Sequence, residues 1–248
     1  MFRRMEPIVI AAALVLAAAC GGAATPVAQA TASPTPIATV APTPVTTNVL
    51  ASGRLDALPA GALFVNYMDL PQVAGGSITH AHIAGFVYAV QGTHEMDIEG
   101  SVPLMIQAGS AAFIGATVKH AHINPSATAA NDWLFIGLRP SSSRPLATIV
   151  PGQKELYTTA ELTQIIPGAY METLSDSRVT ANGVDRQTGP SLRVIYVLDG
   201  TLAVSGDAGM SGTVTTGQGA YSLPGASLVL TAGPAGAHYL IFSLTPAN

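Results

Sequence analysis

The stretch His80-Ala81-His82-Ile83 recurs as His120-Ala121-His122-Ile123, so two copies of one tetrapeptide hold four of the six histidines in this 248-residue chain. Residues i and i+2 of a β-strand point to the same face of the sheet, so each His-Ala-His places two imidazoles side by side. Two such pairs facing each other would bring four neutral imidazoles to one point. Imidazole is the commonest protein ligand for transition metals. The repeated stretch therefore predicts β-structure with a metal site.

The first 19 residues have the pattern of an export signal. Arg3 and Arg4 precede an apolar run at 8–19, which is too short to cross a membrane as a helix. Small residues then lead to Cys20, the only cysteine in the chain. This arrangement resembles a bacterial lipobox, which implies cleavage after residue 19 and lipid on Cys20. We expect an exported protein, held on a membrane at the cell surface or in the periplasm by this anchor alone; an incidental cysteine in a cleaved signal is the alternative.

Residues 20–48 are rich in Ala, Thr and Pro and carry no charged side chain. Such a segment cannot build a core, and its prolines favour the extended polyproline II conformation. We expect a spacer between the anchor and the folded part of the chain, which is compatible with plain disorder.

The remainder of the sequence predicts an all-β fold. Short β-branched and aromatic runs alternate with Gly, Pro, Asn and Asp, as is typical of a sandwich or barrel. The clearest expected strands lie at 86–90, 134–138, 194–198 and 239–242. Asp199-Gly200 and, more weakly, Gln91-Gly92 predict hairpin turns. One short helix is expected to begin near Thr158, because Glu161 completes a capping-box pattern.

An internal repeat divides this part of the chain in two. Three pairs of segments match in the same order, 106 to 110 residues apart: 88–93 with 196–201, 115–117 with 225–227, and 138–140 with 244–246. Matches at a near-constant spacing indicate two copies of one β-domain. We expect domains at 50–140 and 150–247, joined by a linker at 141–145.

The segment from Gly75 to Gly92 resembles the first motif of the cupin family, in which a glycine is followed by His-x-His, a glutamate and a second glycine. His80 and His82 match the two histidines, and Phe86 stands where the glutamate is expected. With the repeat, the resemblance implies two double-stranded β-helix barrels of the RmlC-like jelly-roll type, a bicupin.

The second cupin motif is matched by the spacing of Gly109, His120 and Asn124. Gly115 and Thr117 replace the proline and glycine of its usual turn. The second domain has no histidine at the corresponding positions, which fall near 188–190 and at 229 or 230. We therefore expect only the first domain to bind metal, and the second to support it or to form a dimer interface.

The family's metal site usually combines three histidines with one glutamate, and His80, His82 and His120 occupy the three histidine positions. Phe86 cannot ligate, so the resemblance leaves either a three-histidine site or a fourth ligand from His122. A hydrogen bond to a ligand, or a contact to substrate, is the alternative role for His122. The cofactor would be one divalent transition metal, Zn, Cu, Fe, Mn or Ni, of which zinc and copper best suit all-imidazole ligation.

Further candidates for contacting a substrate are Phe86, Tyr88 and His94. Tyr88 is in phase with Phe86, and His94 alternates in phase with Met96, so all are expected to face inward. A core role is the alternative for each of them, and His94 is expected to lie away from the metal. His238 has no partner histidine and is expected to be structural.

Two functions follow, from different classes. The first is a metalloenzyme acting on a small oxygen-rich substrate, for which the resemblance implies dioxygenase, decarboxylase or isomerase chemistry. The second is a surface lipoprotein that captures a metal or small ligand without turnover. An open three-histidine site suits catalysis, whereas a closed four-histidine site suits binding. The catalytic residues stay unassigned, because Glu95 and Asp97 are expected to point outward.

Two classes of partner can be judged from composition and resemblance. The formal net charge is −4 and there is no basic patch, which argues against nucleic acid. A homodimer is a further expectation, because cupins often pair through edge strands.

Overall fold

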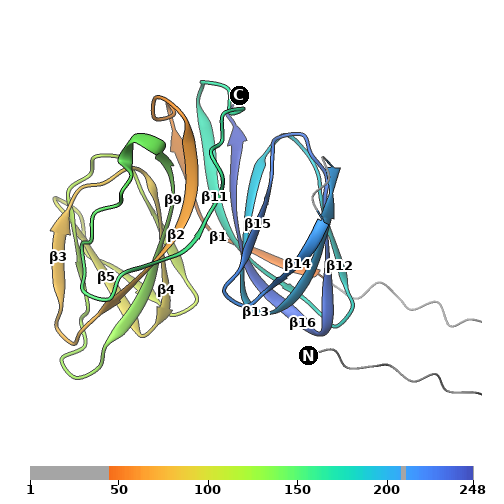
Figure 1. Ribbon diagram of the computed structural model, residues 1–248. Helices are drawn as coiled ribbons and strands as arrows, with labels where there is room; N and C mark the ends of the chain where they lie inside the picture. The colour runs from red at the N-terminus through yellow and green to blue at the C-terminus, as the bar shows by residue number, and fades with distance from the viewer. Residues whose placement is uncertain (1–44, 208–210, 248) are drawn as a thin grey trace, which may run out of the picture. The chain divides into compact units, whose positions relative to one another are not determined.

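The computed structural model describes residues 45–207 and 211–247, shown in colour in Figure 1. This part of the chain forms sixteen β-strands and one 3-10 turn, η1 (Ser141–Ser143). Within the described ranges there is no helix with the length and apolar character needed to span a membrane. The expected signal peptide, Cys20 and most of the expected spacer lie outside them.

The first barrel is built from two sheets that enclose an apolar core. Its strands are β2 (Leu63–Gln72), β3 (Ser77–His80), β4 (Gly85–Gln91), β5 (Thr93–Ile98), β6 (Leu104–Gln107), β7 (Ala111–Ile114), β8 (His120–Ile123), β9 (Asn131–Pro140) and β10 (Lys154–Thr158). One sheet has the order β10-β2-β9-β4-β7 and the other the order β3-β8-β5-β6. Val87, Met96, Trp133 and Phe135 lie in the core between them.

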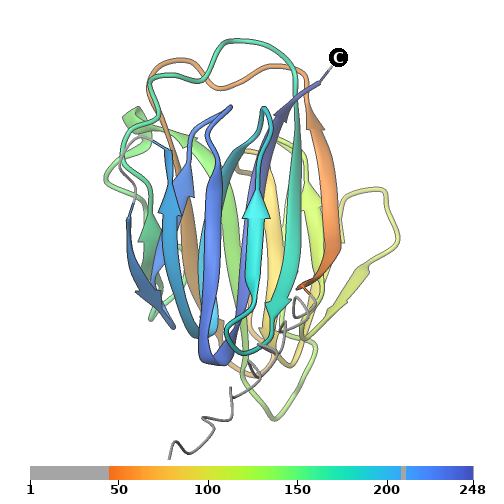
Figure 2. The ribbon, with the colours of Figure 1, turned by 90° about the vertical axis from the view of Figure 1, so that its right-hand side faces the viewer.

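The second barrel repeats this plan with longer strands. Its strands are β11 (Tyr170–Val179), β12 (Val184–Gln187), β13 (Leu192–Gly206), β14 (Ser211–Thr215), β15 (Gly219–Ser222) and β16 (Leu228–Pro246). They match the first barrel in order: β2 with β11, β3 with β12, β4 and β5 with β13, β6 with β14, β7 with β15, and β8 and β9 with β16. The internal repeat is thereby confirmed, and Figures 1 and 2 show the second set of strands.

The two expected hairpin turns are wrong, and both fail for the same reason. Gly92 and Gly200 have φ values of 76° and 85°, which suit glycine. However, β4 pairs with β7 and β9, whereas β5 pairs with β6 and β8. The glycine is thus a corner at which one strand passes from the first sheet to the second. In β13 the same corner is a register shift on either side of Gly200 within a continuous strand.

The expected helix near Thr158 is also wrong. Thr158 belongs to β10 and lies opposite Asn66 of β2. Beyond it, the backbone N–H groups of Thr159 and Leu162 donate to carbonyls of β2. Pairing with the exposed edge of that strand satisfies backbone groups that a one-turn helix would leave open.

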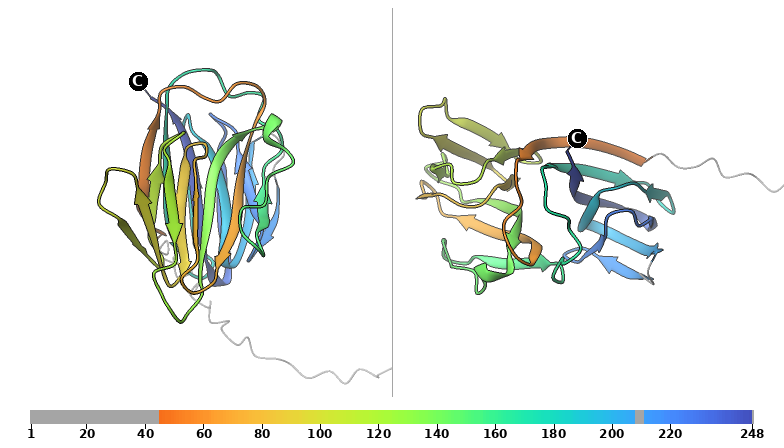
Figure 3. Two further views of the ribbon diagram at one scale, coloured as in Figure 1. Left: turned by 90° about the vertical axis from the view of Figure 1, so that its left-hand side faces the viewer. Right: turned by 90° about the horizontal axis from the view of Figure 1, so that it is seen from above.

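Strands are exchanged across the expected domain division. β1 (Val45–Leu55) precedes the first barrel but pairs along its length with β11 of the second. β10 follows the expected linker but pairs with β2 of the first barrel. Figure 3, seen from above, shows β1 in orange running beside the second barrel. The end of the expected spacer, 45–48, is therefore strand.

A second apolar core joins the barrels. It gathers Tyr67, Phe86 and Leu134 from the first barrel with Val194, Tyr196 and Phe242 from the second. The rings of Tyr67 and Tyr196 stack with centroids 5.1 Å apart. The Tyr67 hydroxyl donates to the carbonyl of Val194 at 3.1 Å. In each barrel, the sheet at this junction thus has one face toward the barrel's own interior and the other face toward the neighbouring barrel.

Candidate metal centre

The structure brings the two His-Ala-His stretches together. β3 and β8 are antiparallel neighbours, with His80 opposite His120. His82 follows in the loop after β3, and its backbone carbonyl accepts a hydrogen bond from the N–H of Thr117 at 2.8 Å. One ring nitrogen from each of His80, His82, His120 and His122 lies within 4.8 Å of all the others. These four residues are called the His cluster below.

Backbone carbonyls set the orientation of two rings in the His cluster. Nδ1 of His120 lies 2.8 Å from the carbonyl oxygen of Val118, and Nδ1 of His82 contacts the carbonyl of Ile83. A carbonyl can only accept, so Nδ1 carries the hydrogen in both rings and donates it. In a neutral imidazole this leaves Nε2 as a lone pair, available to a metal.

The Nε2 atoms of the His cluster point to a common centre. Those of His80 and His82 are buried and have no hydrogen-bond partner among the described residues. Nε2 of His120 lies 2.9 Å from Nε2 of His122. Nitrogens bound to a tetrahedral zinc at 2.0–2.1 Å would be about 3.3 Å apart, within the range that the cluster spans. The donor set and its unpartnered atoms therefore fit a transition metal.

His94 lies directly behind His122, so the expectation that it is remote from the metal is wrong. Its side chain is fully buried, and its Nε2 is 2.9 Å from Nδ1 of His122. The ring of Trp133 stacks on His122 with centroids 4.2 Å apart and an interplanar angle of 13°. The cause is strand pairing: β5 lies beside β8, with Met96 opposite His122. His94 is placed to orient a ligand rather than to contact a substrate.

Burial keeps the histidines neutral. Desolvation lowers the pKa of His80 to about 4, with smaller effects from His120 and Arg139. It lowers the pKa of His82 to about 3 and also lowers the pKa values of His120 and His122. Metal ligation requires deprotonated imidazole, so the cluster is in the ligating form at neutral pH.

Phe86 and Tyr88 lie on the opposite side of β4 from the His cluster. Phe86 is fully buried between the barrels, with its ring centroid 5.5 Å from that of Phe113 and 6.1 Å from that of Phe242. Tyr88 belongs to the same apolar core. Since neighbouring residues of a strand face opposite ways, it is Val87 that faces the first barrel's interior. The interpretation of Phe86 and Tyr88 as substrate contacts is therefore wrong.

A cavity of about 160 Å³ adjoins the His cluster on the side of His80 and His82. Its lining consists of Met68, Leu70, His80, Ala81, His82, Trp133, Phe135, Arg139, Leu146, Ala147, Ile149 and Gln153. The last four belong to the segment between β9 and β10, so residues that follow the expected linker form one wall. Gln153 holds that segment, because its amide donates to the carbonyl of Ala147 and accepts from the N–H of Ile149.

Arg139 and Trp133 were not singled out by the sequence. One signal was available for Arg139: it ends an apolar strand, and its counterpart in the repeat is the neutral Thr245. Trp133 could not be placed without knowing which side of β9 faces the histidines. Asn124, by contrast, joins two loops: its side-chain amide donates to the carbonyl of Val73 after β2 and to that of Ala129 in its own loop.

The second barrel has apolar side chains where the first has the His cluster. The part of β16 that matches β8 carries Leu228 and Leu230, both buried in that barrel's core. His238 lies further along β16 and shares a hydrogen bond of 2.5 Å with Asp176. Its partner is thus a carboxylate on the neighbouring strand.

Comparison with known proteins identifies the fold. No family model matches the sequence, and no curated protein matches it. AerE from Microcystis aeruginosa is similar in structure over 79% of this chain and 97% of its own, with 14% identity and a TM-score of 0.52. Procruciferin, an 11S globulin from Brassica napus, matches over 81% and 85%, with 12% identity and a TM-score of 0.52.

YhaK from Escherichia coli matches over 73% of this chain and 86% of its own, with 13% identity and a TM-score of 0.50. At these identities the likeness concerns the fold. The chain has the cupin fold in a bicupin-like arrangement of two β-barrels, as its motifs and repeat predict.

Proposed function

We propose that the first barrel binds one divalent transition metal through the Nε2 atoms of the His cluster, with His80, His82 and His120 as ligands and His122 either as a fourth ligand or as a neighbour of an open three-histidine site. We further propose that the protein acts on a small oxygen-rich organic molecule in the adjoining cavity, as a dioxygenase-like oxidoreductase. The observation that carries the proposal is the pair of buried Nε2 atoms on His80 and His82, which lack a partner among the described residues and face two further imidazoles within 4.8 Å. Leaving such atoms unpaired costs roughly 1–3 kcal/mol each.

The chain's own residues determine what this site can do. Neutral nitrogen ligands leave a bound dication its full charge, which favours Lewis acidity and activation of a bound oxygen species. His80 and His82 line the cavity, whereas His120 and His122 lie behind them in β8, so a substrate would approach from the side of His80 and His82. Within the ranges 45–207 and 211–247 no carboxylate lines that cavity, which disfavours proton abstraction by a general base.

Binding without turnover is the second candidate. It is favoured by the fourth imidazole, His122, which is oriented by His94 and sits 2.9 Å from His120. Four protein ligands complete a tetrahedral site and leave no position for a substrate.

Metal analysis of purified variants tests the proposal and separates the two candidates. We expect about one metal per chain in the unaltered protein and in His238→Ala, and none in His80→Ala. Retention in His122→Ala would mean an open three-histidine site, to be followed by oxygen-uptake assays. Loss in His122→Ala would favour the closed binding site. An absence of metal from the unaltered protein, after growth and purification with zinc, copper, iron, manganese or nickel, would refute the metal proposal.

We also propose that the protein is exported and anchored through lipid on Cys20. The support is the sequence pattern of residues 1–20 and the uncharged Ala/Thr/Pro segment that follows. Labelled palmitate should be incorporated into the protein in cells and not into Cys20→Ser. Equal labelling of both would refute the anchor.

A further inference from the structure

Among the described residues, the cavity beside the His cluster is lined by one cationic side chain, and the Nε2 atoms of His80 and His82 that also face it are those assigned to the proposed metal. Among the residues that the structure describes, Arg139 is the only lining side chain charged at neutral pH, and none of them places an aspartate or glutamate in the wall. Burial lowers the pKa of Arg139 to about 10, so the guanidinium stays protonated. The side-chain amide of Gln153 is already hydrogen-bonded to the backbone of its own loop. The chemistry of the cavity therefore favours an anion.

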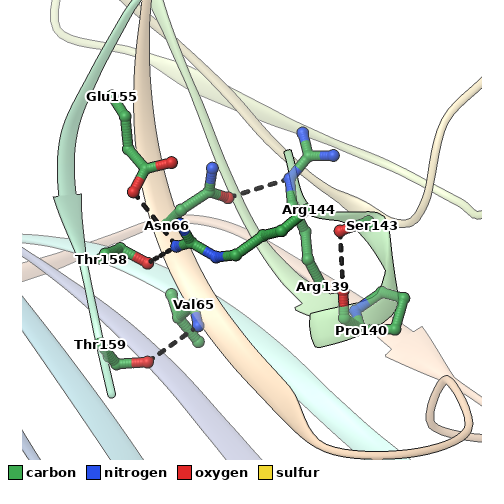
Figure 4. Close-up of polar contacts among 9 residues, drawn as sticks. All are labelled: Val65, Asn66, Arg139, Pro140, Ser143, Arg144, Glu155, Thr158 and Thr159. Carbon is green, nitrogen blue, oxygen red and sulfur yellow. Dashed lines mark hydrogen bonds and ion pairs between the residues drawn. The ribbon is translucent and has the colours of Figure 1, made fainter. Parts of the chain in front are cut away.

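Arg139 is held in place but not neutralised. Its Nε donates to Oδ1 of Asn66 at 3.0 Å, and its Cζ lies 4.8 Å from the centroid of Phe135. Figure 4 shows its terminal nitrogens directed away from Asn66. Within the described part of the chain no carboxylate forms an ion pair with it. The acid that most affects its pKa, Glu155, pairs instead with Arg144 at 3.2 Å.

Apolar side chains make up most of the remaining wall. Met68, Leu70, Trp133, Phe135, Leu146 and Ile149 surround the space between Arg139 and the two histidines. A volume of about 160 Å³ is close to that of the engineered cavity of about 150 Å³ that holds one benzene ring. The space is large enough for one ring or a short branched chain.

We propose that this cavity binds a small monocarboxylate, with the carboxylate on the Arg139 guanidinium and the apolar body against Phe135 and Leu146. The inference deepens the proposed function, and it rests on that function only for the claim that the ligand lies beside a metal. A guanidinium with its Nη atoms free offers two parallel donors to a carboxylate, which an ammonium cannot match. Arg139 lines the same cavity as His80 and His82, so a ligand on Arg139 would lie on the side of the His cluster that faces this cavity.

Benzoate, with benzamide as its neutral counterpart, tests the proposal by calorimetric titration of the full chain, both metal-free and zinc-loaded. Fluorescence of Trp133, the only tryptophan, gives a second readout because this residue lines the cavity. We expect benzoate to bind at least about tenfold more tightly than benzamide in both forms. Arg139→Gln should weaken benzoate binding by at least about tenfold and bring it close to that of benzamide. Arg139→Lys should lie between.

Arg144→Gln is the matched control. Arg144 also lies over an aromatic ring, with Cζ 4.2 Å from the centroid of Phe64, and also donates to side-chain oxygens, Glu155 and Thr158. It does not line the cavity, and Figure 4 shows both arginines together. Benzoate binding should be unchanged in this variant. A similar loss in both arginine variants would overturn the assignment to Arg139.

The remaining outcomes separate this inference from the proposed function. Equal binding of benzoate and benzamide to the unaltered protein, or binding of neither, overturns the carboxylate site whatever the metal content. Benzoate binding that needs zinc and survives in Arg139→Gln also overturns it, because the metal would then hold the carboxylate. If the protein binds no zinc but still binds benzoate through Arg139, this inference stands and the metal proposal is refuted.

Discussion

Replacing His94 with phenylalanine should weaken metal binding although His94 is not a ligand. Without a metal, Nε2–H of His122 donates to Nε2 of His120, 2.9 Å away, and Nδ1 of His122 accepts from His94. If Nε2 of His122 bound a metal, its hydrogen would move to Nδ1 and be donated to Nε2 of His94, whose own hydrogen would then move to Nδ1 of His94. In His94→Phe the Nδ1–H of His122 would have no acceptor, and the hydrogen bond that orients this ring would be lost.

The size of the effect follows from that lost bond. A buried donor without a partner costs about 1–3 kcal/mol, and removing a partner of a metal-ligating histidine typically costs about 10–100-fold in affinity. The two ranges agree, because 10–100-fold corresponds to roughly 1.4–2.7 kcal/mol. We therefore expect His94→Phe to bind zinc about 10–100-fold more weakly, with the stoichiometry unchanged. His94→Gln, whose amide oxygen can accept from Nδ1, should lose less.

Competition with a chelator of known zinc affinity measures this difference. His238→Phe is the control, because it removes a histidine that is also hydrogen-bonded but lies in the second barrel, on Asp176. Zinc affinity in His94→Phe within about twofold of the unaltered protein would refute the assigned role of His94 and argue that His122 is not a ligand. An equal loss in His238→Phe would show that the effect is general destabilisation.

Two further predictions concern stability, measured by urea unfolding. Glu172 is fully buried, neither carboxylate oxygen has a partner among the described residues, and burial raises its pKa to about 8 from 4.5. The folded state holds this proton while the unfolded state releases it above about pH 4.5, so Glu172 costs stability as pH rises from 4.5 to 8, by about 1.4 kcal/mol per pH unit. Glu172→Gln should therefore gain about 2–3 kcal/mol relative to the unaltered protein between pH 5 and pH 7, and a pH-independent difference would contradict this. Thr117 has a φ of 62°, which is strained for a β-branched residue, so Thr117→Asn should add about 1 kcal/mol, whereas Thr213→Asn in strand β14 should add nothing.

Much of the fold followed from local pattern. Short β-branched and aromatic runs predicted the strands, and the repeat predicted two copies of one β-domain. The chain does bend at Gly92 and Gly200, which have positive φ, but the predicted hairpin turns were wrong. The local sequence shows that the chain bends. It does not show whether the chain forms a hairpin or crosses to the opposite sheet, because this depends on which strands pair with β5 and β13.

The candidate site, like the fold, could be predicted from the sequence only in part. Period-2 alternation placed His80 with His82 and His120 with His122, because residues two apart on a strand share a face whatever surrounds them. Phe86 was misplaced because a shift of one residue in the motif alignment turns a side chain to the other face. His94 and Arg139 depend on contacts across 28 and 73 residues, which no local pattern records.

The sequence therefore sufficed for what repeats within a few residues: strand character, the paired histidines, the two-copy plan and the uncharged segment behind Cys20. Tertiary structure was needed for what depends on which strands are neighbours. The pairing of β5 with β8 brings His94 behind His122, and the packing of the segment between β9 and β10 closes a cavity over Arg139. The exchange of β1 and β10 between the barrels belongs to the same group, because edge strands pair with whichever open edge lies nearest in space.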